Sequence, residues 1–164
     1  MSQEEGVITV SFGRDVYQGN YLEDLAIDEN KINEMLKTQP SRYVFWSKMV
    51  AMAKAIYEQK KLELERYTSQ LYTFFRREAE AAGRRETEAT LQAKIRLDQK
   101  TQQLENELVR VKLKLDHLAA IKEAFSQRTQ MLMSLAANLR EEFSSLELSV
   151  YEKTKELENR RSRR

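Results

Sequence analysis

The sequence predicts an all-α protein built from a few long helices. Its 164 residues include only 4 Gly and 1 Pro, and a sheet-rich chain of this length would need many more of both for its turns. Charged residues make up 33% of the chain, which is normal for long helices with several faces in water. Long helices bury little surface alone, so we expect a helical hairpin or coiled coil within an oligomer.

The N-terminal segment, residues 1–24, is acidic and contains one strand-like pattern. Residues 7–12 alternate apolar and polar side chains and are rich in β-branched residues, which is typical of a short strand. Because a single strand is not stable alone, we expect it to pair with a neighbouring subunit, to pack on a helix or to remain a tail. We expect residues 13–20 to form a loop.

Charge is distributed unevenly along the chain. The net charge is +2, but residues 1–30 hold seven acids and one base, which leaves +8 on the rest. This favours a polyanionic partner, a contact between the acidic N-terminus and the basic body, or both. The alternative is that these charges are solvated on helix faces. Four of the last five residues are Arg, so we expect residues 151–164 to form a disordered basic tail.

Residues 25–150 are predicted to form a helical domain for oligomerisation and binding. Asp28, flanked by isoleucines that can form a hydrophobic staple, is a good N-cap for a short helix that should run to about residue 39. Pro40 is expected to end this helix, and Ser41 to cap the next one.

The next helix is predicted to be long and amphipathic, because its apolar residues recur at helical spacing in one stripe. Gly83 is the only glycine in the central part of the chain, and a tight turn there would fold the chain back into a helical hairpin. The stripe consists of Trp46, Met49, Ala53, Ile56, Leu64, Tyr67, Leu71 and Phe74.

A heptad pattern follows the glycine. Between Leu97 and Leu118 the spacings of three and four are those of a coiled-coil seam, and beyond it the second heptad position weakens at Lys122 and Thr129. The pattern leaves open whether the partner helix belongs to the same chain. We expect the seam to mediate oligomerisation through Leu97, Leu104, Leu108, Val111, Leu115 and Leu118.

Catalytic chemistry is not predicted. The chain has no Cys and a single His, His117, which excludes disulfides and a His/Cys metal cluster. Four scattered glycines cannot form a phosphate-binding loop. The N-terminus lacks the apolar run of a signal peptide, and no stretch approaches the roughly 18 apolar residues of a membrane span. We therefore expect no enzymatic activity, no cofactor and no metal.

Basic residues beside aromatic ones, around the predicted turn, are candidates for binding nucleic acid. Tyr72, Phe74 and Phe75 precede them, and a single strand requires cations for its phosphates and ring faces for its bases. The alternative is that the rings complete the apolar stripe and that the bases are solvated and partly neutralised by nearby glutamates. The candidate residues are Arg76, Arg77, Arg84, Arg85, Lys94 and Arg96.

Several features follow one another in a distinctive order. They are residues 22–28 before a short helix with Lys31-Ile32, then Tyr43 and Trp46, Phe74-Phe75, residues 85–88, residues 94–98, residues 118–122 and Gln127-Arg128. In this order, from Leu25 to about Glu142, the chain resembles the UvsY family of phage recombination mediators. That family has basic residues just before the aromatic pair. Here Ser69 and Leu71 occupy those positions, so that DNA contact does not carry over, and the arginines after Phe75 would have to replace it.

The resemblance implies a homo-oligomeric, ring-shaped protein in the cytoplasm of a phage-infected bacterium. Such a mediator would bind single-stranded DNA, contact the recombinase and the single-strand-binding protein, and help the first replace the second without breaking any bond. The main alternative is a structural coiled-coil scaffold that has no affinity for nucleic acid. A helical bundle that binds a membrane surface through its basic face is a third reading, and the apolar positions suit helix seams better.

Overall fold

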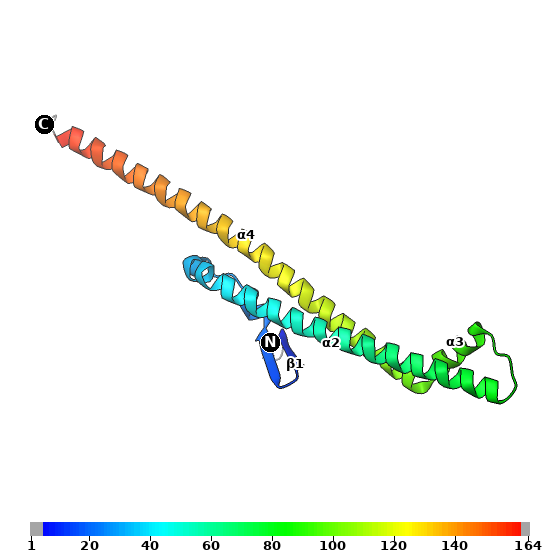
Figure 1. Ribbon diagram of the computed structural model, residues 1–164. Helices are drawn as coiled ribbons and strands as arrows, with labels where there is room; N and C mark the ends of the chain where they lie inside the picture. Colours follow the sequence, from blue (N-terminus) through cyan, green and yellow to red (C-terminus); the bar gives the residue numbers. More distant parts are fainter. Residues whose placement is uncertain (1–4, 162–164) are drawn as a thin grey trace.

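The computed structural model of the chain describes residues 5–161, and the side chains among them through residue 155. Two very long helices, α2 (Ile32–Ala81) and α4 (Gln99–Arg161), lie side by side over much of their length. The short helix α3 (Glu88–Leu97) lies at the end where the chain turns back, and α4 extends well past the start of α2 at the other end (Figure 1). The predicted all-α helical hairpin is confirmed, and the oligomeric state stays a prediction.

The N-terminal segment forms a β-hairpin instead of the single strand and loop that we expected. Strands β1 (Val7–Phe12) and β2 (Asp15–Asn20) pair antiparallel, with Val10 opposite Tyr17. Gly13 has φ +61°, which suits the first central position of a two-residue type II′ hairpin turn. The strand therefore finds its partner within its own segment.

This hairpin packs on the two long helices. Val10 is fully buried in a cluster with Trp46 of α2 and Phe125 of α4. Gly19 makes the close approach possible, because a Cβ on it would lie 2.8 Å from the Phe45 ring. The hairpin is thus a fixed part of the fold.

Helix α2 runs through Pro40, which we expected to end a helix. Proline removes one backbone hydrogen bond within a helix, but packing on α4 holds the segment on both sides of it. The Gln39 side chain is buried and donates to the Phe125 carbonyl (2.8 Å) and to the Thr129 hydroxyl (2.9 Å). Asp28 is an N-cap, as predicted, but the element that it caps is a single 3₁₀ turn (Glu29–Lys31) that leads into α2.

The core lies between α2 and α4 in two clusters. In the larger one the Trp46 and Phe125 rings stack with centroids 5.8 Å apart, and Met49 and Leu118 are fully buried beside them. The smaller one joins Ile32 to Leu132 and Ala136, with Ile27 packed against it. The predicted apolar stripe of α2 therefore forms core in its first half.

The heptad seam contacts α2 of the same chain. Leu104 and Leu118 are buried, whereas Leu108, Val111 and Leu115 are half-buried. Leu97 does not join them: it ends α3 and is 76% exposed. The partner helix of the seam is thus intramolecular, and the role of these six residues in oligomerisation stays a prediction.

The far end of α4 carries apolar side chains that nothing in the described chain covers. Phe143, Leu146 and Val150 follow Leu139, which packs against the cluster at the start of α2, and all three are exposed. The backbone of α4 remains helical to Arg161, where we had expected a disordered tail. Residues 162–164 lie outside the described residues.

Candidate nucleic-acid interface

The turn between α2 and α3 sets the geometry of the candidate interface. Gly83 has φ +64°, a conformation that glycine adopts without steric cost, and the Arg84 amide donates to the Ala79 carbonyl (2.9 Å). Thr87 then caps α3. The predicted turn at Gly83 is confirmed, and it places the basic residues of α2 and of the loop at one end of the molecule (Figure 1).

Three of the predicted basic residues come together there. Arg76, Arg84 and Arg85 line one groove of about 410 Å³. Carboxylates of Glu80, Glu86 and Glu88 line the same groove, along with Tyr72 and Leu91. As many acids as arginines therefore meet in this groove.

Some of the charged side chains in this groove already form hydrogen bonds with other side chains of the fold. Arg76 forms an ion pair with Glu80 (Nε–Oε1 3.4 Å). The pKa of Glu88 is lowered, first by a hydrogen bond from Gln92 and then by one from the Tyr72 hydroxyl (2.8 Å). Glu88 therefore places a hydrogen-bonded carboxylate in the same groove as Arg76.

Lys94 is engaged inside the fold and has a structural role. Its ammonium lies 2.6 Å from the Glu86 carboxylate and 5.7 Å from the centroid of the Phe75 ring. These contacts hold α3 against the end of α2. Leu91 and Ile95, the buried residues of α3, add an apolar contribution. Arg96, at the end of α3, is exposed.

Arg77 points to a different surface from Arg76. It lines a groove of about 670 Å³ on α2, whose other residues are Ser69, Gln70, Thr73, Phe74 and Glu78. Phe74 is 60% exposed, so its ring does not complete the apolar stripe. A role of this ring in binding nucleic acid stays a prediction.

The sequence reasoning missed Arg66. It lines a neighbouring groove of about 530 Å³ that shares Gln70 with the groove of Phe74. The signal was present, because positions 66, 70, 73 and 77 follow helical spacing and residues 66–77 contain no acid. Lys100 of α4 lines the same neighbouring groove.

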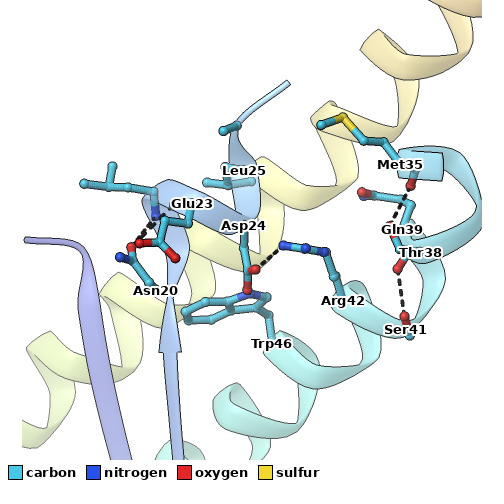
Figure 2. A network of polar contacts seen from close by, with 12 residues as sticks. Asn20, Glu23, Asp24, Leu25, Met35, Thr38, Gln39, Ser41, Arg42 and Trp46 are labelled. Atoms are coloured by element: carbon cyan, nitrogen blue, oxygen red, sulfur yellow. Dashed lines mark hydrogen bonds and ion pairs between the residues drawn. The ribbon is translucent and has the colours of Figure 1, made fainter. Parts of the chain in front are cut away.

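A second concentration of charge, near the start of α2, is structural. The Asp24 carboxylate accepts from the Trp46 indole (3.0 Å) and from Arg42 (Figure 2). Arg128, only 4% exposed, donates to the carbonyls of Leu25 and Ala26 (3.1 Å each) and to the Gln39 side chain. Burial lowers the pKa of Arg128, with the Arg42 charge as the next cause. These contacts fasten the chain after the hairpin to both long helices.

Other kinds of site find little support in the described part of the chain. Among residues 5–155, whose side chains the structure describes, no group of three or more His, Cys, Asp and Glu is placed to hold a metal ion. His117 is exposed, and its ring meets the edge of Tyr21 with centroids 5.6 Å apart. None of the helices in this range has the length and apolar character needed to cross a membrane.

The fold has a counterpart among solved structures. The chain is similar to the bacteriophage T4 recombination mediator protein UvsY, with a TM-score of 0.63 and 15% sequence identity, over 74% of this chain and 92% of that one. No family model matches the chain, and no curated protein sequence matches it. At 15% identity the likeness shows the fold alone, so the chain has a UvsY-like fold.

Proposed function

We propose that this protein is a recombination mediator. It would bind single-stranded DNA and help a recombinase take the place of the single-strand-binding protein, without catalysing any reaction. The observation that carries the proposal is the likeness of its fold to that of a recombination mediator. The exposed arginines and the exposed Phe74 on α2 support it, because they provide the charge and the ring face that a single strand requires.

The mixed charge of the surface sets the expected mode of binding. Arg77, Arg84 and Arg85 form no ion pair with any side chain in the described part of the chain. One copy offers only a few such cations, so affinity for a strand would depend on several copies acting together. We therefore propose a ring-shaped homo-oligomer. By its likeness to a phage mediator, we propose that it works in the cytoplasm of a phage-infected bacterium.

Binding to labelled single-stranded DNA tests this function first. Fluorescence anisotropy across a salt series should show affinity that falls as salt rises, each contacted phosphate contributing about −0.7 to the slope of log K against log salt. Duplex DNA of the same length should bind more weakly. Absence of binding to single strands at low salt would contradict the proposal.

A second assay tests mediation itself. Recombinase filaments should form faster on DNA covered by single-strand-binding protein when this protein is added, and no faster on bare DNA. An equal effect on both substrates would mean that the protein stabilises filaments without helping to displace the competitor.

A structural coiled-coil scaffold is the second candidate function. The exposed apolar residues Phe143, Leu146 and Val150 favour it, because they continue the heptad spacing of α4 beyond the hairpin. A scaffold would assemble through this segment and show no affinity for DNA. Sedimentation and anisotropy on the same preparation therefore separate the two candidates.

A further inference from the structure

Residues 66–77 form an unusual stretch of α2. They contain three arginines, four aromatic residues and no acid, although about one residue in six of the chain is Asp or Glu. Arg76 pairs with Glu80 just beyond the stretch, whereas Arg66 and Arg77 form no ion pair in the described part of the chain. These two cations of the stretch remain available to a polyanion. The four rings are those of Tyr67, Tyr72, Phe74 and Phe75.

Three of these four rings are engaged within the fold. The Tyr67 hydroxyl donates to Asp98 (3.0 Å), and the Lys100 ammonium lies 4.6 Å from its ring centroid. Tyr72 donates to Glu88, and Phe75 lies beneath Lys94. Each of these contacts joins α2 to the segment around α3, so these rings have structural partners.

Phe74 differs from the other three rings. Its centroid lies 5.6 Å from that of Phe75 at an interplanar angle of 64°, so the two rings meet edge to face. It remains 60% exposed, and its groove is lined by the amide of Gln70, two hydroxyls and the guanidinium of Arg77. One carboxylate, that of Glu78, also lines this groove.

Arginines flank Phe74 along the helix. Arg66 and Arg77 lie on the same side of α2 because eleven residues make about three helical turns, and their Cα atoms are about 16 Å apart along the axis. Their grooves share Gln70. The order is thus cation, amide, ring, cation, over a length that a few nucleotides of single strand can follow.

We propose that Phe74 is the residue that stacks on a DNA base and gives the interface its preference for single strands, with Arg66 and Arg77 holding phosphates on either side. This inference rests on the proposed function and assigns residues within it. A ring on a convex helix cannot reach the base faces of a duplex, which are covered by their neighbours, whereas an unpaired base can turn onto it.

The test compares Phe74→Ala with the wild-type protein by anisotropy on single-stranded and duplex DNA. The variant should bind single strands about 5- to 150-fold more weakly, with an unchanged salt slope because no charge is removed. Its affinity for duplex DNA should stay the same. Val44→Ala, at another exposed apolar position of α2, is the matched control and should bind like the wild type.

Two further variants keep the test decisive. Phe74→Trp should retain affinity, and its indole fluorescence should be quenched by a bound strand relative to the wild type. Arg66→Gln combined with Arg77→Gln should reduce the magnitude of the salt slope by about 1.4. If Phe74→Ala binds single strands as tightly as the wild type, or loses duplex affinity equally, the inference is wrong and the proposed function stands. If the wild-type protein binds no single-stranded DNA, both the inference about Phe74 and the proposed function are wrong.

Discussion

Replacing Arg128 with Met should destabilise the protein by about 3 kcal/mol. The guanidinium donates to the carbonyls of Leu25 and Ala26 and to the Gln39 side chain. Three hydrogen bonds from a charged donor contribute about 6 kcal/mol at about 2 kcal/mol each. Met avoids the cost of burying a charge, which we expect to offset about half of that contribution.

Urea denaturation followed by circular dichroism measures this loss, and the melting temperature should fall by about 6–12 °C. Arg140→Met is the matched control, because Arg140 is exposed and, among the described residues, its guanidinium bonds only to the Ala136 carbonyl of its own helix. That variant should stay within about 0.5 kcal/mol of the wild type. If Arg128→Met loses less than about 1 kcal/mol, Arg128 does not fasten the chain after the hairpin to the long helices.

Three other predictions concern the break between α3 and α4, the candidate interface and the far end of α4. The pKa of the Asp98 carboxyl is lowered, first by the hydrogen bond from the Thr101 amide. The stability that this carboxylate contributes is therefore complete above the ordinary pKa of Asp and is lost as the pH falls through the lowered pKa. Asp98→Asn should make the free energy of unfolding depend less on pH in this acid range, as measured by acid denaturation. Arg84→Gln with Arg85→Gln should weaken single-strand binding and reduce the salt slope; an unchanged slope would remove the loop from the interface. Leu146→Asp with Val150→Asp should shift sedimentation towards smaller species at unchanged helicity, because both positions are exposed in the single chain; unchanged assembly would place the contact elsewhere.

The long helices were predictable because their signals are local and periodic. Apolar spacing in α2 and α4, and the glycine at position 83, together specify a hairpin of helices. Pro40 was misleading because its effect is decided by tertiary contacts: the neighbouring Gln39 is held by α4, some 86 residues away in sequence. Strand β2 was missed because Gly19 and Asn20 read as loop residues, and its pairing is fixed by the turn before it.

The candidate interface was only partly predictable, for a similar reason. Composition identified the basic and aromatic residues, but it could not assign them to faces. Adjacent arginines at 76 and 77 point into different grooves, and Lys94 meets Glu86 only because α3 folds back on α2. Leu97 fitted the heptad count, yet the helix breaks at Asp98, which caps α4 and leaves Leu97 outside the seam.

The length of α4 separates the candidate DNA interface from the uncovered apolar segment. Lys100, beside the groove of Arg66, and Val150, on the uncovered apolar segment, are about 75 Å apart along the helix axis at 1.5 Å per residue. Such a distance exceeds the range over which charges act through physiological salt. Association of copies through the C-terminal end of α4 would therefore leave the electrostatics of each candidate interface unchanged. It would determine instead how many of these interfaces one DNA strand can contact at once, and the distance between them.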